Sequence, residues 1–549
     1  MKDTGVRAGS DGDHRTGNGE TNRLSASSTS APRAKLSAAL VAGGILSSRV
    51  SGFIRLWVFN RYFGLSAEAD AFNQAFRIPN LLQNLFGEGA LSASFIPVYS
   101  ALVSGGDRRQ ADRVAGAVAS ILAVLVAVLV LLGVLATPLL VTLIAPGFTG
   151  AKRELTTQIV RILFPGAGLL VLSAWCLGIL NSHYKFLLSY MAPVLWNLAM
   201  IFTLIVYGGS ELPRLAVILA WGSVVGSALQ FLVQLPVVVR VAPDLKFALN
   251  TTSTHVRTIL RNFVPAFISR GVVQLSAYID SILSSLLPTG AISGLLNAQA
   301  LYILPVSLFG MSVSAAELPA MSGALQADPE GREAVRRRLD AGLRRIAFFV
   351  LPSVVAFLAL GDVVAGVLQV GRFTRADTLY VWGILAGASV GLLATTLGRL
   401  YSSTYYAFRD TRTPLNYALV RVALTTVLGY IFAFYLPRWL NISEIWGAAG
   451  LTSSAGIAGW IEMALLRRRM NARIGRTGLP PAYVLKLIVA AVAGAGLAWA
   501  VKLVLPPLPP IVAAIPILGV YGGVYFAVTA AFRIPEISRV VSRLTRRRT

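Results

Sequence analysis

The chain has 549 residues, of which 55% are apolar and only 13% are charged. Soluble domains carry about twice that charged fraction, which excludes a soluble multidomain enzyme and a disordered basic protein. One cysteine and three histidines exclude a disulfide framework and a multi-cysteine or histidine-rich metal centre. The net charge of +25 would favour nucleic-acid binding in a soluble chain, but in an apolar chain it indicates basic loops at the cytoplasmic face of a membrane.

Long apolar segments recur along the whole chain. A spanning helix needs about 20 mostly apolar residues. Fourteen segments meet this condition, near 36–60, 70–102, 114–143, 157–180, 188–207, 215–238, 263–286, 292–323, 346–369, 378–407, 415–436, 446–465, 482–503 and 511–531. The second is the least regular, because Pro79 and the run Gly87-Glu88-Gly89 interrupt it. The sequence predicts an all-α polytopic membrane protein with about 14 transmembrane helices.

The distribution of basic residues predicts the orientation. Residues 1–34 are polar and without periodicity, as in a disordered tail, and 533–549 form a basic tail. With both tails in the cytoplasm, 33 Lys and Arg residues fall on cytoplasmic segments, among them 324–345 and 466–480, and 7 on external loops. We therefore expect both termini in the cytoplasm, and interpret the runs of three arginines as topology signals and not as nucleic-acid sites.

Three arginines lie early within predicted spans: Arg49, Arg55 and Arg77. Arg49 and Arg55 are separated by about 9 Å along a helix, which suits two phosphates, or one phosphate and a nearby acid. Arginine binds phosphate bidentately and stays charged in a partly dry site. The alternative is that such side chains extend to the membrane interface. For Glu88, between two glycines, a helix cap and a gate contact are both open.

Asp280 is an isolated acid in the middle of a predicted span. It could bind Na⁺, take up a proton, or pair with a base on another span. Arg270 is ten positions away, about 15 Å along one helix, which is too far for a direct pair. No Walker A sequence or Gly-rich nucleotide loop is present, so transport would be secondary.

Several strings together closely resemble the MurJ (MviN) family of bacterial lipid II flippases, over about 36–535. They are Ser48-Arg49-Val50-Ser51-Gly52-Phe53-Ile54-Arg55, Asp70-Ala71-Phe72, Phe76-Arg77-Ile78-Pro79-Asn80-Leu81-Leu82, Phe86-Gly87-Glu88-Gly89-Ala90-Leu91-Ser92, Phe95-Ile96-Pro97-Val98, Ala145-Pro146-Gly147-Phe148, Ile179-Leu180-Asn181 and Tyr405-Tyr406-Ala407-Phe408-Arg409-Asp410-Thr411-Arg412-Thr413-Pro414.

The resemblance implies the fold of the multidrug/oligosaccharidyl-lipid/polysaccharide exporter superfamily. Two six-helix lobes, 35–241 and 256–468, would enclose a cavity, and 481–532 would form a groove for the lipid tail. The implied activity is transport and not enzymatic: flipping of undecaprenyl-pyrophosphate-linked disaccharide-pentapeptide (lipid II) by alternating access. The chain would act in the bacterial cytoplasmic (inner) membrane, beside membrane lipids and cell-wall synthesis proteins. The alternatives are an exporter of another lipid-linked glycan or of drugs, and a non-transporting scaffold.

The resemblance also bears on individual residues. Arg49, Arg55 and Asp70 match functional positions of the family, and with Arg77, Asn80, Glu88 and Arg270 they form the predicted substrate-binding set. Some family members are thought to hold Na⁺ in the second lobe, which makes Asp280, Asp410 and Thr426 candidate ligands for Na⁺ coupling, with proton coupling as the alternative and no other cofactor expected. Three positions depart from the family pattern, Leu56, Gln83 and Ala300, and we expect Arg270 to replace one missing charge.

Overall fold

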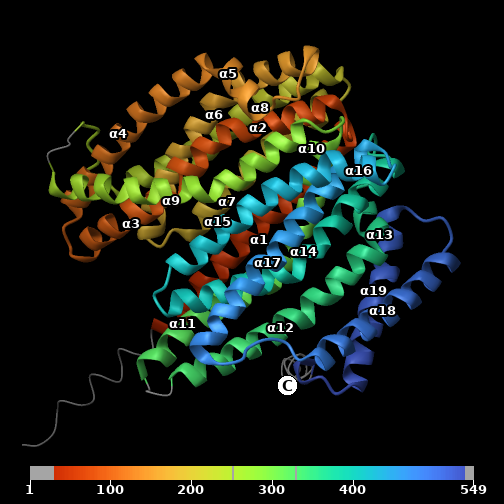
Figure 1. Ribbon diagram of the computed structural model, residues 1–549. Coiled ribbons are helices and arrows are strands. Elements are labelled where there is room, and N and C mark those ends of the chain that lie inside the picture. The colour runs from red at the N-terminus through yellow and green to blue at the C-terminus, as the bar shows by residue number, and fades with distance from the viewer. Residues whose placement is uncertain (1–29, 250–252, 328–330, 538–549) are drawn as a thin grey trace, which may run out of the picture.

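The computed structural model describes residues 30–249, 253–327 and 331–537, so most of both predicted tails lies outside the described residues. Within these ranges all regular structure is helical (Figure 1). Twelve helical stretches are long and apolar enough to cross a membrane. Two further helices, α1 (Ser30–Phe63) and α9 (Thr254–Ser285), are as long but are not among those twelve. The fold class is confirmed, and the count of fourteen stays a prediction.

The first half of the chain forms one bundle with α1. Its other helices are α2 (Ala67–Phe86), α3 (Glu88–Ser104), α4 (Arg108–Leu135), α5 (Thr137–Ile144), α6 (Gly150–Ser182), α7 (Phe186–Tyr207) and α8 (Leu212–Val241). The predicted interruption of the second span is the break between α2 and α3 at Gly87. A Cβ atom at Gly87 would lie 2.4 Å from the carbonyl oxygen of Gln83, so a side chain does not fit at this break.

The second bundle carries two π-helical turns within its spans. It comprises α10 (Ala291–Pro305), η1 (Val306–Met311), α11 (Ser312–Ala327), α12 (Gly331–Ala359), α13 (Gly361–Gly366), α14 (Arg375–Ala407), α15 (Arg412–Tyr430), η2 (Ile431–Tyr435), α16 (Leu436–Trp439), η3 (Glu444–Trp446) and α17 (Gly447–Ile474). One buried cluster runs through α10, α12, α14 and α17, and separate clusters hold the first bundle together. α9, predicted to open the second lobe, packs chiefly on α3 of the first bundle, so the predicted lobe boundaries stay a prediction.

The basic segments 324–345 and 466–480 were predicted to be cytoplasmic loops, but the structure shows that large parts of both are helical. α12 already begins at Gly331, and α17 continues to Ile474. Arginine is a good helix former. An Arg336–Glu333 pair at 2.7 Å, one turn apart, adds to the first turns of α12. The arginine runs therefore sit on helical extensions of the spans.

The last two helices, α18 (Pro481–Val504) and α19 (Pro510–Ala531), form a hairpin on the side of the second lobe (Figure 1). α18 packs on α12, and α19 packs on α13. The Tyr521 hydroxyl donates to the carbonyl oxygen of Pro352 at 2.6 Å, and Lys502 forms an ion pair with Asp362. Many other side chains of the hairpin are apolar and exposed, as expected for a surface that faces lipid.

Loops predicted on the same side of the membrane meet at the same end of the molecule. At the end predicted to be external, the Arg372 amide donates to the carbonyl oxygen of Arg61 at 2.9 Å. At the opposite end, Arg109 lies 3.8 Å from Asp244, and the Gly478 amide donates to Asp340 at 3.0 Å. The contacts thus agree with the sorting of loops by basic residues, and the cytoplasmic orientation of the termini stays a prediction.

Candidate functional site

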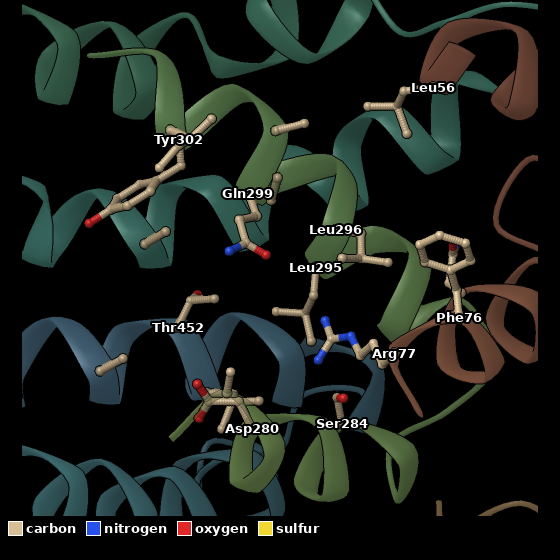
Figure 2. Close-up of a pocket in the computed structure, with 18 of the residues that line it drawn as sticks. Leu56, Phe76, Arg77, Asp280, Ser284, Leu295, Leu296, Gln299, Tyr302 and Thr452 are labelled. Carbon is tan, nitrogen blue, oxygen red and sulfur yellow. The ribbon is translucent and has the colours of Figure 1, made fainter. Parts of the chain in front are cut away.

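A cavity of about 870 Å³ lies between the two lobes, lined by α1, α2, α9, α10, α14, α15 and α17. Its walls carry four arginines and one carboxylate: Arg49, Arg55, Arg77, Arg421 and Asp280. Figure 2 shows Arg77 of α2 and Asp280 of α9 directed into the open space. The structure therefore brings together the three arginines predicted from the first two spans, with Asn80 beside them.

Arg55 is held by uncharged partners. Its Nε donates to Asn197 Oδ1 at 3.0 Å, and its guanidinium lies 5.0 Å from the ring centroid of Trp196. Asn197 is fixed in turn, because its Nδ2 donates to the Ser51 hydroxyl at 3.0 Å. A neutral amide and an aromatic face position an arginine without cancelling its charge. The sequence analysis did not predict Trp196 and Asn197 as site residues. The available signal was Asn197, an amide in the middle of an apolar span.

The first-lobe wall carries an excess of positive charge. Arg49 is exposed at the cavity, and Arg77 is half-buried. In the described part of the chain, neither they nor Arg55 forms an ion pair, whereas other partly buried bases pair with carboxylates. The Tyr278 hydroxyl of α9 donates to the carbonyl oxygen of Arg77 at 3.0 Å, which fixes the backbone of α2 at this point. This wall can attract and bind an anion.

The second-lobe wall carries charges of both signs. Asp280 of α9 interacts electrostatically with Arg77 and with Arg421 of α15. Arg421 lies 3.3 Å from Glu462 of α17 and was not predicted as a site residue. Gln299 of α10 points into the cavity, and Ala300 also lines it, so α10 brings no charge at this level (Figure 2).

Asp70 lies outside the cavity lining and joins the two lobes at the end predicted to be external. Its carboxylate is 1% exposed and accepts from the amides of Gly290 at 2.7 Å and Ser293 at 2.9 Å, at the start of α10. Lys152 of α6 pairs with it at 3.0 Å. A carboxylate at a helix N-terminus is favourable because the amides there are unpaired and the helix dipole is positive.

Further side-chain contacts between the lobes surround Asp70. Asn60 donates to Asn297 at 2.6 Å, and Asn73 donates to Ser293 at 3.0 Å. Ser281 of α9 donates to Gln74 of α2 at 2.9 Å. These polar contacts form a layer across the lobe interface, so the cavity is closed toward this end.

Comparison with known proteins bears on this arrangement. The family model described as "Lipid II flippase MurJ" matches residues 59–513. The chain belongs to the MurJ family. The "Lipid II flippase MurJ" of Burkholderia cenocepacia is 31% identical over 78% of this chain and 81% of its own length. The "Probable lipid II flippase MurJ" of Vibrio cholerae is 30% identical over 79% of this chain and 82% of its own.

Solved structures show the same fold. "Lipid II flippase MurJ, inward closed conformation" aligns with a TM-score of 0.74 at 24% identity, covering 90% of this chain and 98% of that one. An inward-facing multidrug resistance MATE family transporter of the MOP superfamily aligns with a TM-score of 0.63 at 18% identity, covering 78% and 95%. These likenesses confirm the predicted fold.

Two of the Na⁺ ligands suggested by the MurJ resemblance, Asp410 and Thr426, lie far apart. Asp410 lies just before α15, and Thr426 lies about 21 Å along that helix from its first residue, at about 1.5 Å per residue. The Thr426 hydroxyl donates to the carbonyl oxygen of Val422 at 2.8 Å. Among the described residues, no group of three carboxylate, histidine or cysteine side chains could hold a metal ion. Asp410 and Thr426 therefore do not share one cation site, and a cation at Asp280 stays a prediction.

Asp410 has a local partner set instead. Arg473 of α17 donates to its Oδ2 at 2.5 Å, and the Thr413 amide and hydroxyl donate to its two oxygens at 3.0 and 2.8 Å. Burial alone would raise the pKa of Asp410, but the hydrogen bonds from Thr413 and Arg473 outweigh it and hold the pKa below its usual value. Asp410 thus ties the start of α15 to the end of α17.

Two residues of the predicted substrate set can be placed only by their backbone. Glu88 is the first residue of α3, directly after the break at Gly87, and Arg270 lies within α9. Their side chains are outside those that the structure describes. The role expected for Arg270 as a replacement charge stays a prediction.

Proposed function

We propose that this MurJ-family chain flips lipid II from the inner to the outer leaflet of the bacterial cytoplasmic membrane by alternating access. The observation that carries the proposal is the first-lobe wall of the cavity, where Arg49, Arg55 and Arg77 lack ion pairs with any described carboxylate. An uncompensated charge away from bulk water is costly unless a ligand of opposite sign binds there. The pyrophosphate of lipid II is such a ligand.

Each part of the cavity has a role in this mechanism. Arg55 is held in place by Asn197 and Trp196 and presents its remaining N–H groups to the pyrophosphate. The contacts of Asp70 keep the external end closed while the headgroup enters from the cytoplasmic side. Opening of that end and closing of the other then exposes the headgroup to the outside.

The polyprenyl tail remains in the membrane, beside the α18–α19 hairpin. A shallow apolar hollow on α18, lined by Ala500, Val501 and Val504 among others, is suited to such a chain. We place both termini in the cytoplasm, because this orientation puts most basic residues there. The orientation is consistent with recruitment of cell-wall synthesis proteins at the opposite face, where the product emerges.

Coupling to a cation or a proton is a second part of the proposal, and Asp280 is the residue we assign to it. It is the one carboxylate among the described lining residues of the cavity, and it interacts with arginines of both lobes. A change in its charge would alter how strongly it competes with an anion for Arg77. Asp410 and Thr426 have no part in this scheme.

Complementation of a flippase-depleted bacterium, read out by the accessibility of lipid II in the outer leaflet, tests the proposal. Arg49→Ala and Arg55→Ala should abolish flipping and leave membrane insertion intact. Arg55→Lys should rescue it only in part, since lysine lacks the planar fork. Arg161→Ala is the matched control, because Arg161 is exposed on α6 and outside the cavity lining. Full complementation by both cavity variants would refute the proposal.

A further inference from the structure

The second lobe supplies one cation to the described lining of the cavity, and this is Arg421 of α15. The other lining arginines, Arg49, Arg55 and Arg77, stand on α1 and α2 of the opposite wall. A ligand that contacts only those three is bound to one lobe. A ligand that also contacts Arg421 is bound to both.

Arg421 is only partly engaged by its protein partner. Its Nη1 lies 3.3 Å from Glu462 Oε2, while the side chain remains 36% exposed. A guanidinium has five N–H donors, so this single contact leaves donors free for a ligand in the cavity. Glu462, 13% exposed, fixes the direction of the side chain without saturating it.

Two further interactions locate the Arg421 guanidinium within the cavity. Tyr302 of α10 interacts electrostatically with Arg421 and lines the same cavity as Gln299 and Ala300. Asp280 interacts with both Arg421 and Arg77. The two arginines, from opposite lobes, therefore line one cavity and both interact with its carboxylate.

We propose that Arg421 is a substrate-binding residue that takes one phosphate of a lipid-linked pyrophosphate, while the first-lobe arginines take the other. Glu462 is its positioning residue. The proposal rests on the proposed function and deepens it, because it makes selection of a pyrophosphate over a monophosphate a property of the second lobe. A bridging pyrophosphate replaces Asp280 as the shared partner of Arg77 and Arg421 and draws the two walls together.

Binding of two lipids to the purified full chain in detergent tests this assignment: undecaprenyl pyrophosphate and undecaprenyl monophosphate. Arg421→Ala should weaken pyrophosphate binding by about 10- to 100-fold, the loss expected for a charge-assisted bidentate contact. Monophosphate binding should change little, because the first-lobe arginines suffice for one phosphate. Arg161→Ala should leave both affinities unchanged.

Two double variants separate a binding role from a structural one. Arg421→Ala/Ala300→Arg returns a cation to the same wall from α10 and should restore part of the preference for pyrophosphate. Arg421→Ala/Glu462→Gln removes the unpaired acid and should restore the melting temperature but not the preference. Recovery of pyrophosphate binding in the second double variant, or equal losses for both lipids in Arg421→Ala, would overturn the assignment. If the unmutated chain binds neither lipid, the proposed function itself fails.

Discussion

The contacts of Asp70 lead to a quantitative prediction about the closed external end. The carboxylate accepts two hydrogen bonds from α10 of the other lobe and an ion pair from Lys152 of its own lobe. A hydrogen bond to a charged group contributes about 1.5–3 kcal/mol, so the two bonds between lobes stabilise closure by about 3–6 kcal/mol. At about 1.4 kcal/mol per factor of ten, Asp70→Ala should shift the equilibrium toward external opening by two to four orders of magnitude.

A graded series separates this effect from general damage. Asp70→Asn keeps one acceptor oxygen and should shift the equilibrium by about half as much in free energy as Asp70→Ala. Lys152→Met removes the same ion pair but keeps both bonds to α10, so it should affect stability more than closure.

Distances between spin labels report the equilibrium directly. We would place labels at Arg153 and Arg375, which are exposed at the external ends of α6 and α14, in a Cys176→Ala background. Asp70→Ala should broaden the distance distribution or shift it to longer values, and Lys152→Met should not. The reasoning is refuted if Lys152→Met opens this end as much as Asp70→Ala does, or if neither variant changes the distribution.

Three further predictions concern the site and the ends of the spans. Asn197→Asp should keep Arg55 in place but neutralise it, so flipping should fall about tenfold or more while the melting temperature stays level or rises; unchanged flipping would contradict the role of the neutral partner. Asp410→Asn should lower the melting temperature at pH 7, and the gap to the unmutated chain should narrow as the pH falls toward the depressed pKa of Asp410, because its stabilisation exists only while the carboxylate is ionised; a gap that does not change with pH would argue for packing instead. Single cysteines should react with an impermeant reagent at the predicted external positions Gly150, Thr289 and Arg375. They should not react at the predicted cytoplasmic positions Arg108, Arg337 and Arg469, and one reversed site would require a new count of the spans.

The spans and the arginine cluster could be predicted from the sequence because they depend on composition over many residues. Apolar runs locate helices whatever their neighbours are, and Arg49, Arg55 and Arg77 are conspicuous in such runs. The break at Gly87 was predictable for the same reason, since glycine and proline act on the local backbone. The extensions of α12 and α17 were missed because hydropathy marks the bilayer and not the end of a helix.

The partners of each charge could not be predicted, because they come from helices distant in sequence. Asp70 resembled a ligand-binding residue in a motif, but the start of α10, some 220 positions later, supplies its hydrogen bonds. Asp410 and Thr426 were expected to bind one Na⁺ ion and are only 16 positions apart in the sequence. The length of α15 nevertheless keeps them apart in space. Arg421 was one charged residue among many until the packing of α15 placed it in the cavity.

The chemistry of the partner distinguishes the bases that hold this fold from those that serve a ligand. Lys502 pairs with Asp362 and Arg473 pairs with Asp410, and in both cases the pair joins two helices and leaves little free charge. Arg55 instead rests on an amide and an indole, so its charge is available to the cavity. Arg421 lies between these cases, since Glu462 contacts one nitrogen and the rest of the fork is free. A cavity whose first wall is strongly cationic and whose second wall is partly neutralised binds an anion first to the fixed arginines. The second lobe then closes on this anion only if a second phosphate competes with Glu462 and Asp280 for Arg421. The acids of the second lobe thereby select a substrate with two phosphates, because only such a substrate can bind both lobes.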